Sequence, residues 1–501
     1  MNRHPFLAAT LLSLLSGPLI ANAATAKDDD PFTLFDVASP GRTVTAELLD
    51  LDGDGRSDVF TVVFSGLPPD EKREIRVFYQ TPEGALPSSP DWTGPLPDGA
   101  AAFETADLLQ GPGTDVLFLT RNSVVVLSFA DRVPTEHEIR VPGGPTIALA
   151  EDERGLDRIA LLREGLADEP LFVLPGLAEI IVMTTRGEEV ARLDVGARAN
   201  YFLPPRPGLM ISESEVEISF DAPRFGMGDA NGDGRVDILS ANRFEMRIFH
   251  QREGGHFPVL ADIVVPVGRI SEDDHLSSSG RVRFEWSDFD GDGRVDVLVG
   301  HTSGGVFRAE TRTALHLNGE GGFQLDRPDQ AFLTDGGFAT QQLLDLDGDG
   351  RVELLTVRFP LGILEIIGVL VTRKLDAEVL VYRPEPSGVF SKRPVHKREV
   401  RTAFDLESFR PRGFIPTFLA DVSGDGLRDF LDSGGGKTLS VYLGGPELDY
   451  SKRAARMKMD TNGLINFGDF DGDGLTDLLV YDPLRADAPI RIAVNRGLLS
   501  N

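Results

Sequence analysis

The stretch that decides the fold is Trp286-Ser-Asp-Phe-Asp-Gly-Asp-Gly-Arg-Val-Asp-Val-Leu-Val-Gly300. Asp288, Asp290 and Asp292 stand at alternate positions, and Asp296 comes eight residues after the first of them. Closely spaced carboxylates that bend around glycine form a cluster of hard oxygen ligands, which suits Ca²⁺. The apolar run after Asp296 predicts a β-strand. The stretch therefore predicts a calcium-binding loop that leads into a strand.

Five further copies of this loop occur along the chain. They begin at Asp50, Asp229, Asp345, Asp421 and Asp469. Two more segments, near residues 107 and 149, keep only parts of the pattern, and we expect them to form the same turn without a strong metal site. The eight starting points are about 60 residues apart on average, which is the length of a four-stranded propeller blade with generous loops. The repeat therefore predicts eight similar β units.

The two ends of the chain suggest how these units close into a ring. The last unit has three strands before the chain ends at Asn501, whereas Phe32–Val37 is a strand-like run outside any unit. We expect this run to supply the fourth strand of the last blade, because closure leaves no long sheet edge exposed. The predicted fold is an all-β propeller of four-stranded blades in one domain over residues 31–501. Motif counting favours eight blades, with seven as the alternative.

The N-terminus predicts export. Arg3 and His4 give a positive start, residues 7–15 are mostly apolar, and Ala21-Asn22-Ala23 fits the small-x-small cleavage rule. The apolar stretch is shorter than the roughly 20 residues that span a bilayer. We therefore expect residues 1–23 to be a cleaved signal peptide, the mature protein to be secreted or periplasmic, and no membrane span to remain.

Composition narrows the partners. The chain carries 79 acidic and 50 basic side chains, a formal net charge of −29. A protein this acidic is a poor candidate for nucleic acid or anionic lipid, because phosphate recognition needs positive charge. It has no cysteine, which excludes disulfides, thiolate zinc sites and a cysteine nucleophile. Much of the acidic excess lies in the repeated loops, where bound metal would partly neutralise it.

Each intact loop offers side-chain oxygens at positions one, three, five and nine, and the backbone carbonyl of position seven lies between them. Positions four and six are glycine in all six copies, and glycine tolerates the positive φ that turns the carboxylates inward. An EF-hand needs a glutamate at position twelve and helices on both sides, and these loops have neither. Simple Asp-Gly hairpin turns do not require four conserved ligand positions in six copies.

We therefore expect about six structural Ca²⁺ ions. The predicted ligands are Asp50, Asp52, Asp54, Arg56, Asp58, Asp229, Asn231, Asp233, Arg235, Asp237, Asp288, Asp290, Asp292, Arg294, Asp296, Asp345, Asp347, Asp349, Arg351, Glu353, Asp421, Ser423, Asp425, Leu427, Asp429, Asp469, Asp471, Asp473, Leu475 and Asp477, where the arginines and leucines act through their carbonyls.

The run Phe467-Gly-Asp-Phe-Asp-Gly-Asp-Gly-Leu-Thr-Asp-Leu-Leu-Val480 resembles the FG-GAP/VCBS repeats of integrin α-subunit-like β-propellers. The resemblance covers nearly all of the chain after residue 31 and implies a propeller with Ca²⁺ in the loops that join the first two strands of its blades. The segments near 107 and 149 depart from the pattern, so we assign no ion to them. Such proteins include adhesion ectodomains, lectins and polysaccharide lyases, and the fold alone does not choose among them.

No catalytic signature accompanies the repeats: the sequence has no Gly-x-Ser-x-Gly elbow, His-Glu-x-x-His helix or phosphate-binding loop. His250 and His301 are the two histidines that could point into a central pocket. We expect a monomeric ring that acts as a non-catalytic binding or adhesion scaffold for a glycan or an extracellular or periplasmic protein. The alternative is a polysaccharide lyase or other carbohydrate-active enzyme on the same fold, which a cluster of His, Lys, Tyr and Arg at one channel mouth would favour.

Overall fold

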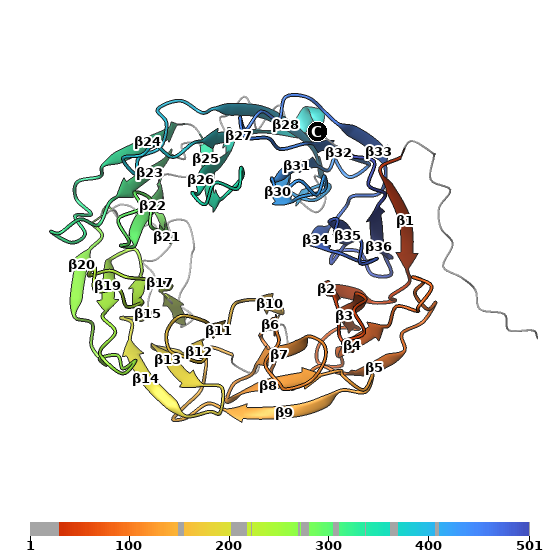
Figure 1. Cartoon of the computed structure of the whole chain (residues 1–501), viewed down its shortest axis with the longest axis horizontal. Helices are drawn as coiled ribbons and strands as arrows, with labels where there is room; N and C mark the ends of the chain where they lie inside the picture. Colours follow the sequence, from red (N-terminus) through yellow and green to blue (C-terminus); the bar gives the residue numbers. More distant parts are fainter. Residues whose placement is uncertain are drawn as a thin grey trace, which may run out of the picture.

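Short runs rich in Val, Ile, Leu and Phe form strands throughout the chain, because branched and aromatic side chains pack well on a pleated surface. The computed structural model describes residues 30–148, 155–201, 218–221, 223–268, 271, 280–303, 310–335, 337–360, 369–405 and 410–499. Eight antiparallel sheets stand around a central opening, so the predicted eight-bladed β-propeller is confirmed (Figure 1). The predicted signal peptide, residues 1–23, lies outside the described residues.

The first half of the chain forms four blades, and each is listed here from the channel outward. Blade one is β2 (Arg42–Leu49), β3 (Asp58–Ser65), β4 (Lys72–Phe78) and β5 (Trp92–Pro95). Blade two is β6 (Ala102–Ala106), β7 (Asp115–Leu119), β8 (Ser123–Ser128) and β9 (Thr135–Arg140). Blade three is β11 (Leu162–Arg163), β12 (Leu171–Pro175), β13 (Glu179–Thr184) and β14 (Glu189–Asp194). Blade four is β17 (Arg224–Gly228), β18 (Asp237–Ala241), β19 (Glu245–Phe249) and β20 (Ile263–Pro266).

The second half of the chain forms the other four blades. Blade five is β21 (Arg281–Ser287), β22 (Asp296–Ser303), β23 (Glu310–His316) and β24 (Gln330–Asp335). Blade six is β25 (Gly337–Leu344), β26 (Glu353–Pro360), β27 (Lys374–Tyr382) and β28 (His396–Asp405), extended by β29 (Arg410–Pro411). Blade seven is β30 (Thr417–Ala420), β31 (Asp429–Asp432), β32 (Thr438–Tyr442) and β33 (Ala455–Lys458). Blade eight is β34 (Leu464–Gly468), β35 (Asp477–Tyr481), β36 (Ile490–Asn495) and β1 (Phe32–Val37).

Ring closure follows the prediction. β1 pairs antiparallel with β36, from Phe32 opposite Asn495 to Val37 opposite Ile490. The Arg491 guanidinium donates two hydrogen bonds to the Asp36 carboxylate, each 2.7 Å long. The N-terminal strand is therefore the outer strand of the last blade, and the ring is closed by hydrogen bonds between the two ends of the chain.

The core lies between neighbouring blades rather than inside one of them. At the closure seam, Val59 of blade one packs in one buried cluster with Leu479 and Ile492 of blade eight. The second strands are the most deeply buried elements, and every residue of β7, β18 and β35 is buried. Each blade therefore depends on the two beside it, and a single blade has no complete core of its own.

Blade three differs from the sequence-based alignment. Leu149, taken as the first loop position of that unit, lies outside the described residues. The segment after it forms β10 (Asp157–Arg158), which pairs parallel with β6 of blade two. The carboxylate of Glu104 on β6 holds the next residues through the amides of Leu161 and Leu162, at 2.7 and 2.8 Å. The first two strands of blade three are therefore joined by residues 164–170, not by the segment near 149.

Two insertions extend the regular pattern. β15 (Arg198–Tyr201) and β16 (Ile218–Asp221) form a separate two-stranded sheet between blades three and four. In blade six, part of the apolar run 359–371 falls outside the described residues, and 369–372 form a short helical turn. Within the described part of the chain, no helix combines enough length and apolar character to span a bilayer.

Candidate metal centres

The six acidic loops all join the first strand of a blade to its second strand, so they gather at one end of the ring. Loops of adjacent blades touch through their backbones. The Thr114 amide donates to the Asp50 carbonyl, and the Val295 amide donates to the Asp229 carbonyl, both at 2.7 Å. The loops thus form a rim around one mouth of the channel, and backbone hydrogen bonds join these neighbouring loops.

Each loop is folded by its own carboxylates. In blade five, Asp288 accepts hydrogen bonds from the amides of Gly291 and Gly293 at 2.7 and 2.9 Å, and the Arg294 amide donates to Asp292 at 2.8 Å. The two glycines have φ of 77° and 86°, the left-handed conformation that glycine adopts without strain. The two bonds to the position-one carboxylate recur in all six loops at 2.6–3.0 Å.

The ninth position is the buried anchor of the loop. Asp296 is 1% exposed, and its two oxygens accept from the amides of Phe289 and Asn318 at 2.9 and 2.7 Å. The first donor is loop position two, and the second lies two residues beyond the end of the third strand. The same pair of bonds is made by the ninth-position aspartates of blades one, four, seven and eight. This carboxylate therefore ties the loop to the blade core.

Blade six departs from this scheme in a way that bears on metal binding. Glu353 is fully buried; the Leu346 amide donates to its Oε2 at 2.9 Å, but its Oε1 has no hydrogen-bond partner among the described residues. The equivalent of Asn318 here is Pro384, which has no N–H to donate. Oδ1 of Asp347, in the same cluster, also lacks a partner. Two acceptor oxygens left without donors in one acidic cluster fit a site that is completed by a cation.

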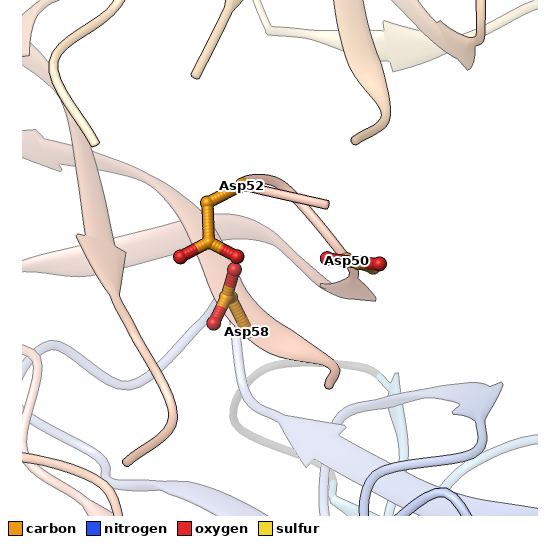
Figure 2. Close-up of side chains that lie close together, drawn as sticks. All are labelled: Asp50, Asp52 and Asp58. Carbon is orange, nitrogen blue, oxygen red and sulfur yellow. The ribbon is translucent and has the colours of Figure 1, made fainter. Parts of the chain in front are cut away.

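Three carboxylates converge in four of the six loops. Asp50, Asp52 and Asp58 bring ligand oxygens within 4.8 Å of one another, and Figure 2 shows these three side chains grouped at the loop. Three further clusters of the same size occur among the described residues: Asp288, Asp290 and Asp292; Asp345, Asp347 and Glu353; and Asp469, Asp471 and Asp477. The loops of blades four and seven carry Asn231 and Ser423 at position three, which replace one carboxylate by a neutral oxygen donor. The position-seven carbonyls stay a prediction.

Burial and like charge together oppose ionisation of the anchors. Burial, reinforced by the neighbouring loop carboxylates, raises the pKa of Asp58 and Glu353 to about 7. The same causes raise the pKa values of Asp296, Asp429 and Asp477 to about 6. A bound divalent cation reverses this balance, because it stabilises the ionised form of every carboxylate around it.

Two loops already hold a cationic side chain from elsewhere in the ring. Arg132, on the turn between β8 and β9 of blade two, approaches Asp52 and Asp54 of blade one at 2.6 and 3.2 Å. Arg383 pairs with Asp347 of its own blade at 3.3 Å. In the described structure no ion pair forms with the first, third or fifth carboxylates of blades five and eight. The six candidate sites therefore differ in charge, which loop spacing alone did not reveal.

Amide side chains link successive loops, and this was also missed from the sequence. The Asn318 side chain donates to the Ala230 carbonyl, at loop position two of the preceding blade, at 2.8 Å. Gln80 reaches Phe470 and Asn495 reaches Val422 in the same way, both at 2.7 Å. The available signal was a Gln or Asn at the end of the third strand or two residues after it. These side chains join the anchor of one loop to the backbone of the preceding blade's loop.

The predicted channel histidine His250 belongs to the rim instead. Its Nδ1 lies 2.9 Å from Asp237 and 3.3 Å from the Asn231 amide nitrogen, so it faces the loop of its own blade.

In blade two the ninth-position Asp115 is retained and accepts from the amides of Leu108 and Leu109 at 3.0 and 2.7 Å. Blade two thus keeps the anchor without the ligands, as the degenerate sequence predicted for the turn. What the six intact loops offer chemically is hard oxygen donors for a divalent cation.

Comparison with known proteins supports the repeat assignment. FG-GAP-like repeats match residues 229–299 and 288–356, which contain three of the six loops. The chain therefore carries FG-GAP-like repeats in a β-propeller, as the resemblance implied. No curated protein matches the sequence.

Two solved structures match this chain over most of its length. A lectin from Agrocybe aegerita, described as recognising non-reducing terminal N-acetylglucosamine, is 14% identical over 90% of this chain and 85% of its own, with a TM-score of 0.35. The V. cholerae biofilm matrix protein Bap1 is 11% identical over 96% of this chain and 91% of its own, with a TM-score of 0.39. Neither likeness is close enough to indicate a ligand for this chain.

Proposed function

We propose that this propeller of FG-GAP-like repeats is an exported protein that binds Ca²⁺ in its six rim loops and serves as a non-catalytic scaffold for a glycan or protein ligand. The observation that carries the calcium part is the buried Glu353, whose unpartnered Oε1 lies in a carboxylate cluster at the rim. Five further loops repeat the same fold around different carboxylate sets. The ions act structurally, because the loops brace neighbouring blades.

The binding role rests on the difference between the repeated loops and the surfaces that do not repeat. The six loops repeat, so they shape the blades and do not distinguish one ligand from another. Specificity then belongs to surfaces that do not repeat, as loops and channel walls on a rigid scaffold commonly carry binding. Export is supported by the signal-like N-terminus. Because the chain has no cysteine, an exported form takes its stability from core, repeats and metal and not from disulfides.

The test is a binding survey of the calcium-loaded protein against a glycan array and against cell-surface protein extracts. We expect saturable binding to a defined glycan class or a single protein, and loss of that binding when a chelator removes calcium and loosens the rim. Binding to neither class would overturn the scaffold function. Release of unsaturated, ultraviolet-absorbing products from an acidic polysaccharide would overturn its non-catalytic character in favour of a lyase.

A further inference from the structure

A cleft of about 720 Å³ opens on the channel wall, and none of its lining residues belongs to a metal cluster. Its lining comes from blades two to five, including β10, β11, β17 and β21, and Figure 1 shows these strands facing the central opening. A volume of this size suits a small molecule or a few units of a polymer. None of the repeated acidic loop positions lines it, so the cleft is a feature of this chain's individual blades.

One wall is aromatic and fixed in place. Trp286 stacks on Phe284 with ring centroids 5.8 Å apart and an angle of 16° between the planes. The indole also covers the backbone of Gly226 on the neighbouring blade, where a Cβ would come within 2.5 Å of the ring. Phe225, next to that glycine, adds a second aromatic side chain to the lining. Packing thus holds the indole in one position between blades four and five.

Two hydrogen-bond donors in this wall have no partner among the described residues. Nε1 of Trp286 and Nε of Arg163 have almost no exposed surface and make no hydrogen bond within the described chain. Each of these atoms can only donate, so each is satisfied only by an acceptor. Because buried polar groups are almost always paired in native structures, these donors favour a ligand whose oxygens reach the wall over an apolar ligand.

The charged side chains of the cleft indicate which kind of oxygen-rich ligand it would bind. Arg163 forms no ion pair with any carboxylate of the described chain, and its guanidinium lies 5.8 Å from the centre of the Phe225 ring. Glu285 is balanced differently: burial raises its pKa, and the nearby positive charges of Arg224 and Arg283 oppose that rise. Asp157, the other acid in the lining, is exposed on β10. Arg163 and Arg224 are thus the two cations of the lining, and within the described chain neither forms an ion pair.

We propose that this channel cleft binds a saccharide that carries a carboxylate, with Arg163 pairing the carboxylate and Trp286 and Glu285 contacting the sugar ring and its hydroxyls. A guanidinium matches a carboxylate through two parallel hydrogen bonds. Sugar hydroxyls both donate and accept, which suits an unpaired N–H beside a carboxylate, and the aromatic wall suits the apolar face of a pyranose. An acidic peptide offers the carboxylate but no pyranose face and no ring hydroxyls, so it would leave the aromatic wall without its contact. The inference rests on the proposed binding function and locates it.

The two tryptophans make the site directly observable. Trp92 lies in blade one, so the Trp92→Phe protein retains Trp286 as its single indole. We expect a saturable fluorescence change when a tetrasaccharide of β-1,4-linked glucuronic acid is added. Cellotetraose, which has the same linkage without carboxylates, should bind at least tenfold more weakly, and a tetraglutamate peptide should give no change. An equal response to cellotetraose or to the peptide would overturn the proposal.

Paired substitutions assign the role to Arg163. In the same background, Arg163→Gln should weaken tetrasaccharide binding at least tenfold, with an unchanged circular dichroism spectrum. Arg186→Gln is the matched control, because that side chain is 74% exposed outside the cleft. Unaltered binding by Arg163→Gln would refute the site. If the chain binds a glycan in the array while the fluorescence of Trp286 stays constant, the scaffold function stands and the channel cleft is excluded as its location.

Discussion

Removal of calcium should lower the melting temperature of this protein by several degrees. Extracellular calcium modules bind with dissociation constants of about 0.1–1 mM, so 1 mM Ca²⁺ stabilises each occupied loop by about 0.4–1.4 kcal/mol. Six loops together then contribute roughly 2–8 kcal/mol if they act independently. A folded region of about 470 residues has an unfolding entropy of about 1 kcal/mol per kelvin, so the expected change is about 2–8 °C.

The assay is differential scanning calorimetry in 1 mM CaCl₂ and in excess chelator, with 1 mM MgCl₂ as the ion control. Mg²⁺ demands stricter octahedral geometry and gives up its water reluctantly, so it should recover only a small part of the shift. Asp471→Asn removes a carboxylate that burial and the neighbouring Asp473 and Asp469 hold at a raised pKa. It should reduce the calcium-dependent shift by about one site's share, whereas Asp98→Asn, at an exposed acid outside the loops, should not.

The calcium reasoning fails if the transition temperature is the same in calcium and in chelator. It also fails if Asp471→Asn leaves the calcium-dependent shift intact, because the loop would then not be where the ion acts. A calcium-free protein that melts higher for Asp471→Asn than for the wild type would agree with relief of like-charge repulsion within an empty loop.

Three further outcomes follow from the geometry. In chelator, the protein should lose stability as pH rises from about 5 to 8. The buried ninth-position carboxylates stay protonated in the folded state up to about pH 6–7 but lose their protons near pH 4 when unfolded. Thermal melts at both pH values check the sign, and a higher melting temperature at pH 8 would contradict it. Arg132→Gln should lower calcium-free stability by about 1 kcal/mol or less, because it removes a surface ion pair. It should also tighten calcium binding in blade one, since Asp52 loses its counter-charge. An unchanged calcium affinity in titration calorimetry would show that the reasoning is wrong. Phe32→Ala should lower the free energy of unfolding, measured by urea denaturation, by about 3–5 kcal/mol, because it empties a fully buried position in the closing strand. Asp36→Asn in the same strand should lower it by less than about 1 kcal/mol. Similar losses for both variants would argue against core packing as the basis of closure.

The fold was readable from the sequence because each blade repeats one local signal. The Asp-x-Asp-Gly-Asp-Gly pattern places two glycines with positive φ and a buried anchor in every intact loop, so loop, strand and blade follow from local residues alone. Closure was also predictable, because the orphan strand Phe32–Val37 matched the missing outer strand of blade eight. The repeat mispredicted the structure only where the motif is degenerate. Blade three begins with β11, whereas the segment near residue 149 was aligned to that blade by an isolated aspartate.

The parts of the site that spacing could not predict are those made between blades. Arg132 reaches the loop of blade one from a turn about 80 residues away, and nothing in that loop's sequence indicates its approach. The cleft around Arg163 and Trp286 depends on which side chains four different blades turn toward the channel. Such contacts are decided by tertiary packing, which a periodic motif does not encode. The unpaired Glu353 oxygen was similarly hidden, since it results from a proline two residues past another strand.

The hydrogen bonds between β1 and β36 also set the order in which this protein can fold. Asp36 and Arg491 are 455 residues apart in sequence, so the last sheet cannot be completed until nearly the whole described chain has been synthesised. Contacts over such separations form slowly, because a very long loop must close before they stabilise anything. Until then β1 is a lone strand, and β36 stays an open edge from its synthesis until β1 pairs with it; both can pair with other chains. We therefore expect the nascent protein to need protection from aggregation late in its synthesis, and a shortened chain that lacks β36 to be the form most prone to associate.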